Sequence, residues 1–436
     1  MNTVRRYTQL LKGAIALGAI LITGFLIFAF LSQALKIYGL DAISAVLPKW
    51  AVERGMDLTK LVPVRFLYMK AMLLGLAQQS LGLLLFLLAI WLNGPGRLWH
   101  HVLNKAFTKA AAKEAIPEMP KNALSEKQLF FEAFRFRLAW VIICLVMSII
   151  CNFPIHGSSY DIIPLSIIPG GIEKLFNGML FYILLRKLSK FKAFIVYLAF
   201  YTTATLLVLE GTIFMRHRSW SSVTQADLLK EPMKSISQML QKHGKDISLV
   251  GVSPLLTNGI NAYFSESLFQ QKILITRSFI DSVGISTETK VAVISHELGH
   301  YHHHHILQHL LVARIIGTFE IITNFTFFHI FSAEHSVVAT AFGLTSSLDT
   351  ATAGLAYSEA IFSRIASSLR IFELWFSRLH EAQADQFAKQ NGHAEGLIDF
   401  LIKVDNPLMA YLSPAFEWAF LSHPSSLYRI SKLLDK

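Results

Sequence analysis

The chain has 436 residues, of which 53% are hydrophobic and only 16% are charged. A soluble protein carries nearer about a quarter charged residues, so this composition excludes an ordinary soluble enzyme. The net charge of +11 does not indicate a nucleic-acid partner. Its basic residues form short runs beside apolar segments, such as Arg186 and Lys187, and no stripe with interleaved aromatics. We therefore predict an integral, multi-pass membrane protein.

Apolar stretches long enough to cross roughly 30 Å of hydrocarbon occur throughout the first half of the chain. We expect residues 1–215 to form an N-terminal transmembrane region of about four or five spans. The stretch Leu175–Leu185 is too short to span the membrane alone and would need the residues before it to complete a span. The predicted spans are Gly13–Leu35, Ala71–Leu92, Leu138–Phe153 and Ala193–Met215.

Charge in the connections bears on topology. The connection Asn93–Arg137 is rich in Lys and Arg and is predicted to be cytoplasmic, whereas Pro154–Gly171 has neither and is predicted to be external. Residues 216–305 lie outside if Leu175–Leu185 spans the membrane, and in the cytoplasm if it does not. The sequence leaves both alternatives open.

Residues 216–305 form the longest polar stretch and the predicted catalytic region. We expect an amphipathic helix near Gln225–His243, ended by Gly244, then β-like runs at Asp246–Val252 and Gln271–Phe279. A further helix is predicted to begin at Thr287. Together with the spans, these elements predict a mainly α polytopic membrane protein whose zincin-type catalytic domain contains a small antiparallel β-sheet.

Residues 306–376 are predicted to be transmembrane or amphipathic helices. Ile306–Phe331 is long enough to span, although it contains Arg314 and Glu320. Ala353–Phe376 carries four charged residues, so it is expected to pack against protein or to line a wet cavity. Residues 377–436 are predicted to form C-terminal catalytic helices.

The motif H-E-L-G-H at His296–His300 carries the chemistry. On a helix, side chains four residues apart project from one face about 6 Å apart, and two imidazoles so placed can share one tetrahedral Zn²⁺. Glu297 can then take a proton from a metal-activated water. The competing interpretation is a helix with coincidental histidines.

Four consecutive histidines, His302–His305, follow the motif. On a helix each points about 100° from the last, so they cannot converge on one ion. The simplest interpretation is a polar collar at the start of a span. A second metal site or a transport relay is the alternative.

A hydrolytic zinc site needs a third protein ligand. No histidine follows at the spacing used by one class of zinc peptidase, so a carboxylate on a later helix is expected. The stretch Ser377–Ala388 offers Glu381 and Asp385 on one face. One carboxylate can bind the metal while the other orients a ligand histidine. The alternative is that both simply face solvent on an exposed helix.

These elements resemble the integral-membrane zinc metalloendopeptidases that include the CaaX prenyl proteases and the HtpX heat-shock proteases. The resemblance covers roughly residues 225–431, and the spans before the motif are more similar to those of the CaaX branch. Besides H-E-L-G-H it rests on S-R-x-x-E-x-x-A-D at Ser377–Asp385, N-A-Y-F at Asn261–Phe264, and S-H-P-S-S-L-Y-R-I at Ser422–Ile430.

The resemblance implies one Zn²⁺ per chain and a role for each matching residue. The implied zinc ligands are His296, His300 and Glu381, with Glu297 as general base. Asp385 would hydrogen-bond a ligand histidine, and Arg378 would brace its helix. His423 and Arg429 would help to hold the oxyanion, and Asn261, Ala262 and Tyr263 would seat the substrate along an edge strand.

The favoured hypothesis is therefore a membrane-embedded zinc endopeptidase that acts on membrane-associated or lipidated proteins through a zinc-activated water. A non-enzymatic, histidine-rich metal carrier or sensor is the main alternative, and a membrane scaffold with a structural zinc is a third. For location we predict the bacterial inner membrane.

Overall fold

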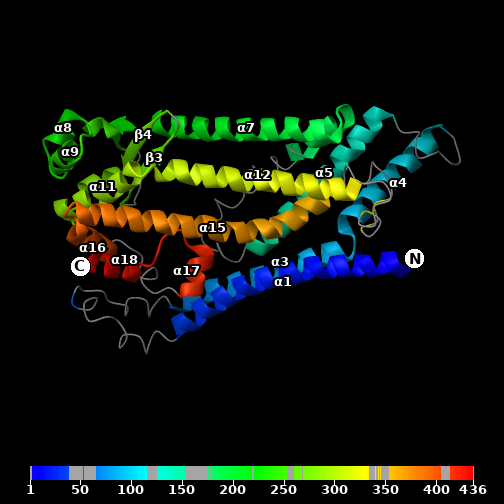
Figure 1. Cartoon of the computed structure of the whole chain (residues 1–436), viewed down its shortest axis with the longest axis horizontal. Helices are drawn as coiled ribbons and strands as arrows, with labels where there is room; N and C mark the ends of the chain where they lie inside the picture. Colours follow the sequence, from blue (N-terminus) through cyan, green and yellow to red (C-terminus); the bar gives the residue numbers. More distant parts are fainter. Residues whose placement is uncertain are drawn as a thin grey trace. The chain divides into compact units, whose positions relative to one another are not determined.

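The computed structural model is mainly helical with one small sheet (Figure 1), and this confirms the predicted fold class. It describes residues 2–38, 53, 65–114, 125–152, 175–176, 178–218, 220–252, 260–267, 269–332, 339, 342, 344, 353–403 and 413–435. The predicted external loop Pro154–Gly171 lies outside these residues.

The chain divides into two compact units. The first comprises Met1–Leu31, Lys70–Tyr201 and Ile316–Leu369, and the second comprises Ser32–Met69, Thr202–Ile315 and Arg370–Lys436. Seven long helices contribute to them: α1 (Asn2–Tyr38), α3 (Arg65–Trp91), α4 (Gly94–Glu114), α5 (Glu126–Asn152), α7 (Lys190–Arg218), α12 (His305–Ser332) and α15 (Leu355–Gln390).

Within the described residues, three helices are long and apolar enough to cross a membrane: Gln9–Lys36, Phe191–Met215 and His305–Ile330. The predicted spans in α1, α7 and α12 thus form helices with the length and composition of a membrane span. Apolar side chains on α1 and α7, among them Leu21, Leu207 and Val208, are exposed, as helices in contact with lipid require.

The other predicted spans have different outcomes. Ala71–Leu92 lies in α3, where Gln79–Trp91 meets the criterion only as a pair with Gly94–Ala106, bent by 58°. Leu138–Phe153 forms the second half of α5 up to Asn152; its last residue is not described, and it stays a prediction. The segment after Leu175 is helical at 178–187, too short to span alone.

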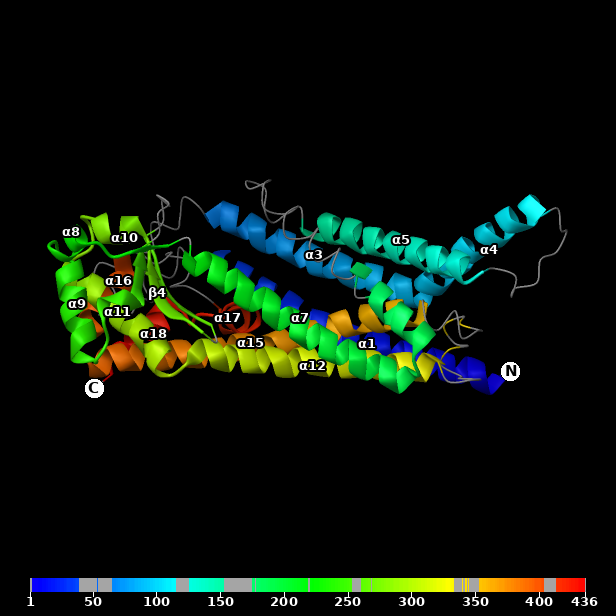
Figure 2. The ribbon, with the colours of Figure 1, turned by 90° about the horizontal axis from the view of Figure 1, so that it is seen from above.

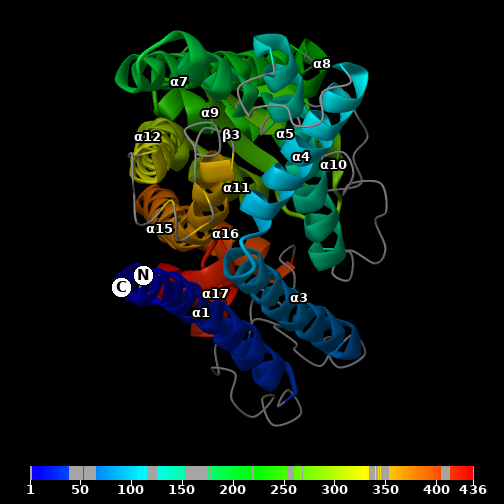
Figure 3. The same ribbon diagram turned by 90° about the vertical axis from the view of Figure 1, so that its right-hand side faces the viewer.

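The core of the first unit contains the fully buried rings of Trp99, Phe136 and Tyr357. The Trp99 and Phe136 rings meet edge to face, with centroids 5.4 Å apart, and they join α4 to α5, which lie side by side in Figures 2 and 3. This contact fixes the α4–α5 pair inside the unit.

One charged residue of Ala353–Phe376, Glu359, packs against protein as the sequence predicts, whereas Arg370 is exposed. Glu359 accepts two hydrogen bonds from the guanidinium of Arg137, at 2.8 and 3.1 Å. The Arg137 side chain is only 3% exposed. A side chain at Gly178 would collide with this guanidinium, because a Cβ there would lie 2.0 Å from it.

The second unit contains the four-stranded sheet, in the order β1-β2-β4-β3. The strands β2 and β4 run parallel while the other two pairs are antiparallel, so the sheet is mixed rather than antiparallel as predicted. Consequently β3 is an edge strand. The bounds are β1 (Ser221–Ser222), β2 (Val250–Val252), β3 (Ala262–Glu266) and β4 (Gln271–Ile275).

Two helices replace the single one predicted near Gln225–His243: α8 (Gln225–Leu228) and α9 (Met233–Lys242). Pro232 separates them, since it lacks the N–H that a continuous helix needs. A reciprocal capping box between Thr224 and Asp227 begins α8. Gly244 follows α9 at φ +67, which confirms the predicted stop.

Helix α11 (Thr287–His302) begins at the predicted residue, where the Ser286 side chain accepts the Thr289 N–H at 3.1 Å. Almost every residue up to Gly299 is buried, because α11 lies among α9, the sheet and α16 (Figures 1 and 2). The remaining elements are the 3₁₀ turn η3 (Ile247–Leu249), α10 (Arg277–Asp281), α16 (Ala394–Lys403), α17 (Pro414–Phe420) and α18 (Ser426–Leu434).

Candidate metal centre and active site

Two histidines on α11 face one point. His296 and His300 lie one helical turn apart, and their Nε2 atoms are 3.2 Å from each other. Both side chains are largely buried. The motif helix therefore presents two ring nitrogens side by side, as the sequence predicts.

Glu381 on α15 completes a triangle with them. Its Oε2 lies 3.5 Å from His296 Nε2, and its Oε1 lies 3.4 Å from His300 Nε2. One ligand atom from each residue falls within 4.8 Å of the others. Two ligands bound at about 2.1 Å with a tetrahedral angle stand about 3.4 Å apart, so these three side chains fit a zinc ion.

The close approach of α15 to α11 depends on Gly299, between the two histidines. A Cβ at this position would lie 2.9 Å from the Ala384 Cα and 3.1 Å from the Phe387 Cβ. Only glycine leaves room for the α15 backbone here. This contact brings Glu381 and Asp385 over the histidine pair.

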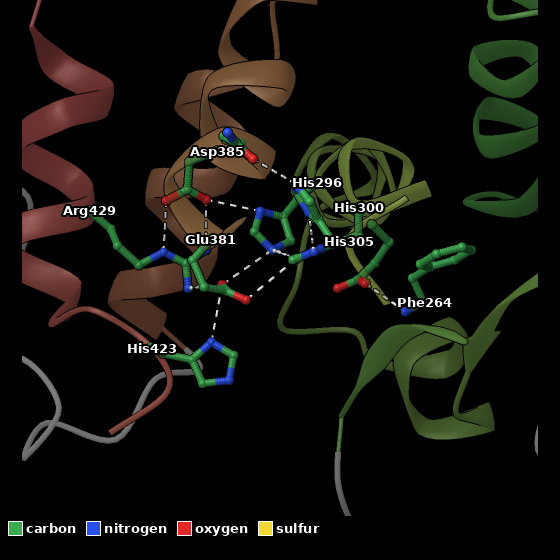
Figure 4. A network of polar contacts seen from close by, with 10 residues as sticks. Phe264, His296, His300, His305, Glu381, Asp385, His423 and Arg429 are labelled. Atoms are coloured by element: carbon green, nitrogen blue, oxygen red, sulfur yellow. Dashed lines mark hydrogen bonds and ion pairs between the residues drawn. The ribbon is translucent and has the colours of Figure 1, made fainter. Parts of the chain in front are cut away.

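Asp385 supports His296 from behind. Its Oδ1 lies 2.9 Å from His296 Nδ1, with an angle that departs from that of an ideal hydrogen bond. Arg429 donates two hydrogen bonds to the same carboxylate, at 2.7 and 2.8 Å (Figure 4). The carboxylate is thus held between an imidazole and a guanidinium.

The site favours a cation between its rings and carboxylates. Burial alone would lower the pKa of His296, but Asp385 and Glu381 outweigh it and raise the pKa to about 10. Burial would likewise raise the pKa of Glu381, but hydrogen bonds from the imidazoles hold it well below its usual value. Charged carboxylates facing buried imidazoles stabilise either a proton or a metal ion at this point.

His423 and Arg429 reach the carboxylate of Glu381 from the C-terminal segment. His423 Nδ1 lies 3.1 Å from Oε2, and Arg429 Nη1 lies 3.4 Å from it. The hydrogen bond to Glu381 raises the pKa of His423, whose side chain is 55% exposed. Arg429, in contrast, directs all three guanidinium nitrogens at carboxylates.

Arg378, one turn before Glu381, joins α15 to α17. Its Nη1 donates to the carbonyl oxygens of Glu417 and Leu421, at 2.9 and 2.6 Å. The Glu417 carbonyl lies in the last turn of α17 and also accepts the Leu421 N–H at 3.2 Å, and Leu421 follows the end of the helix. The Arg378 guanidinium also lies over the ring of Trp418, 5.3 Å from its centroid.

Glu297 contacts the edge strand. The backbone N–H of Phe264 donates to Glu297 Oε2 at 2.7 Å (Figure 4). Asn261 pairs toward the sheet instead: its N–H donates to Thr276 Oγ1 at 3.2 Å, and its carbonyl accepts the Thr276 N–H at 3.0 Å. The backbone N–H and C=O groups of successive residues point to opposite sides of a strand. Those of Ala262 and Phe264 therefore point toward the open edge of the sheet.

A cavity of about 410 Å³ connects these groups, a size typical of ligand sites. Its lining includes the three expected substrate-binding residues, the zinc-ligand candidates, Glu297, His423 and Arg429. Further lining residues are His305, Ile306, His309, Ser377 and His380.

The histidine run is not one helix. Helix α11 ends at His302, and α12 begins at His305 after a turn in which His304 has φ 52. The buried carboxylate of Glu266 caps the new helix, since it accepts the Leu307 N–H at 3.4 Å and lies 3.1 Å from His304 Nδ1. The assumption of even 100° steps along the run is therefore wrong.

His305 is a site residue that the sequence did not single out. It is 1% exposed, and its Nδ1 lies 2.8 Å from His300 Nδ1. His380 stacks on its ring with centroids 4.1 Å apart. The position of His305 in the run carried no signal, because only the helix break turns it toward the metal centre.

Comparison with known proteins agrees with this geometry. Residues 227–436 match Peptidase family M48. The CAAX prenyl protease 1 homolog of Homo sapiens is 30% identical over 156 residues, which cover 34% of this chain and 31% of that protein. The CAAX prenyl protease 1 of Saccharomyces cerevisiae is 26% identical over 185 residues, or 40% of each. The matches thus span about a third of the relatives' own length.

A solved structure has the same fold along almost the whole chain. The crystal structure of S. mikatae Ste24p superimposes with a TM-score of 0.57 and 18% identity, covering 95% of this chain and 98% of that one. The family match and the relatives support a membrane metalloprotease. The resemblance of the chain to the CaaX prenyl proteases is confirmed by these matches.

Proposed function

We propose that the protein is a zinc-dependent endopeptidase of the gluzincin type that cleaves membrane-associated or lipidated proteins. The observation that carries this proposal is the triangle of His296 Nε2, His300 Nε2 and the Glu381 carboxylate, with sides of 3.2 to 3.5 Å. These residues would hold one zinc ion. When bound, zinc supplies a Lewis acid that makes a water nucleophilic near neutral pH and polarises the peptide carbonyl.

Glu297 is the general base in this proposal. It follows the first ligand directly, lines the cavity, and has one carboxylate oxygen fixed by Phe264 N–H at 2.7 Å. The other oxygen accepts a proton from the attacking water and later donates it to the leaving amine. Because the Glu297 carboxylate is already oriented, little free energy is needed to reorient it during the reaction.

We assign oxyanion stabilisation to His423. Its ring lines the cavity and is more than half exposed, and its raised pKa favours the charged form that binds an oxyanion. Arg429 is also expected near the oxyanion from the sequence. Its contacts with Asp385 and Glu381 support a positioning role through those carboxylates instead.

The substrate backbone is proposed to bind along the edge of β3. By the alternation described above, the backbone groups of Ala262 point toward this edge, and Asn261, Ala262 and Tyr263 all line the cavity. An extended peptide can add there as one more strand. This geometry would lay the scissile carbonyl beside Glu297.

The substrate class follows from the surroundings of the site. Helix α12, a candidate span, begins five residues after His300, which supports a site beside the membrane. Proteins named for the cleavage of prenylated CAAX sequences are among the relatives, which supports lipidated substrates. The bacterial inner membrane stays a prediction, because the relatives named above are eukaryotic.

The alternative of a metal carrier based on His302–His305 has less support. Within the described residues, the one group of three side chains able to hold a metal is His296, His300 and Glu381. His302 and His304 are exposed and outside it.

The proposal is tested by cleavage of a lipidated membrane-protein reporter by the purified, zinc-loaded protein. The Glu297→Gln variant should lose activity by about 100- to 10,000-fold while it retains zinc. Glu288→Gln, an exposed glutamate on the same helix, serves as the matched control and should cleave normally. Equal cleavage by the wild type and Glu297→Gln would contradict the proposed mechanism.

A further inference from the structure

The two candidate zinc ligands on α11 are supported in different ways. His296 has a charged partner, since its Nδ1 faces the carboxylate of Asp385 at 2.9 Å. His300 has a neutral one, because its Nδ1 lies 2.8 Å from Nδ1 of His305. His305 in turn lies, through its Nε2, 2.8 Å from Oε1 of Gln383. Figure 4 shows His300 and His305 beside the site.

Only one assignment of protons satisfies this chain of contacts. A metal at His300 Nε2 takes the lone pair of that nitrogen, so the neutral ring carries its proton on Nδ1. His300 then donates, and His305 Nδ1 must accept. His305 consequently carries its own proton on Nε2 and donates it to the Gln383 carbonyl oxygen, which can only accept. Each contact has one donor and one acceptor.

We infer that His305 and Gln383 are positioning residues that fix the tautomer and the ring rotation of His300 without adding charge to the site. The inference rests on the proposed zinc site. Groups that hydrogen-bond a metal-binding histidine set its orientation and its basicity. Here a neutral partner on His300 complements the anionic partner on His296.

The fold holds His305 in place for this role. The break at His303–His304 restarts the helix, so His305 occupies the first turn of α12 and is 1% exposed. Its ring stacks on His380 with an interplanar angle of 9°, which leaves the in-plane nitrogens free to hydrogen-bond. Gln383 is exposed on α15, so its replacement disturbs no core.

The test uses the full-length protein in detergent and measures zinc affinity by competition with a chelator. His305→Phe keeps the stacking ring and removes the acceptor, and Gln383→Met keeps the length of the side chain and removes the next acceptor. The matched controls are His302→Gln in the same histidine run and Gln386→Met one turn along α15. Both control residues are exposed. A second measurement is the visible absorption spectrum of each protein loaded with Co²⁺.

We expect His305→Phe to raise the zinc dissociation constant by about 10- to 100-fold, Gln383→Met to raise it in the same direction, and both to alter the cobalt spectrum. The controls should match the wild type within about twofold. If His305→Phe does not fold, Gln383→Met decides alone. A folded variant with unchanged zinc affinity and cobalt spectrum overturns the inference. A wild type that binds no zinc overturns the proposed function instead.

Discussion

The backbone N–H of Phe264 donates a 2.7 Å hydrogen bond to Oε2 of Glu297. The edge strand that is proposed to bind substrate therefore also positions the proposed general base. Binding and proton transfer are coupled through one peptide group.

This coupling predicts the effect of removing a single N–H. Phe264→Pro removes the donor, and proline is tolerated where an edge-strand N–H faces away from the sheet. We expect its kcat to fall about tenfold below that of Phe264→Ala, because both variants lose the ring but only one loses the hydrogen bond. Zinc content should be equal in both. Equal kcat values would show that the N–H does not position Glu297.

Asp385 is predicted to support zinc binding through His296. In Asp385→Asn the carboxylate is replaced by an amide, so His296 Nδ1 loses its anionic partner and Arg429 keeps only the carboxylate of Glu381 as a counter-charge. The zinc dissociation constant should rise by about 10- to 100-fold. Asp435→Asn, at an exposed ion pair with Lys432, should leave the affinity unchanged. An unchanged affinity in Asp385→Asn would remove Asp385 from the site.

The buried ion pair in the first unit gives a stability prediction. Glu359→Ala leaves the guanidinium of Arg137 buried without a counter-charge, which costs about 3–5 kcal/mol. The expected result is a clear fall in the thermal unfolding midpoint in detergent. The double variant Arg137→Met/Glu359→Leu removes both charges and should recover most of the loss. If the double variant is less stable than Glu359→Ala, the burial of an unpaired charge is not the cause.

Local patterns predicted much of this molecule. The i, i+4 spacing of His296 and His300 and the start of α11 at Thr287 follow from local backbone rules, which the sequence displays directly. The spacing of Glu381 and Asp385 marks them as a candidate pair, but which of them binds the metal follows only from the family resemblance. Their place over the histidines depends on the contact of Gly299 with Ala384, far along the chain.

The features that the sequence did not predict depend on local breaks in the backbone or on the pairing of distant strands. Pro232 divides one predicted amphipathic helix into two. The turn at His303–His304 makes His305 a buried partner of His300 instead of part of a polar collar. The parallel pairing of β2 with β4 likewise depends on how strands separated in sequence meet, which periodicity does not determine.

The capping box of α8 gives a prediction for pH. Hydrogen bonds from Arg277 and then from Thr224 lower the pKa of Asp227 to about 2. A lowered folded-state pKa stabilises the fold above the unfolded pKa of about 3.9, and this contribution disappears as the pH falls toward about 2. Asp227→Asn should therefore lower the free energy of unfolding by about 1 kcal/mol near neutral pH.

The difference between the wild type and Asp227→Asn should shrink near pH 3, as measured by thermal unfolding. Glu288→Gln, at an exposed glutamate on α11, is the control. A difference that stays constant with pH would mean that Asp227 acts through packing rather than through its charge.

The central claim is that His296, His300 and Glu381 hold one zinc ion. X-ray absorption at the zinc edge of the purified, zinc-loaded protein tests it most directly. The account predicts one zinc per chain with two imidazole nitrogens and oxygen ligands at about 2.0–2.1 Å, and loss of the zinc in Glu381→Ala. A shell of three or more imidazoles that survives Glu381→Ala, or a protein without bound zinc, would contradict it.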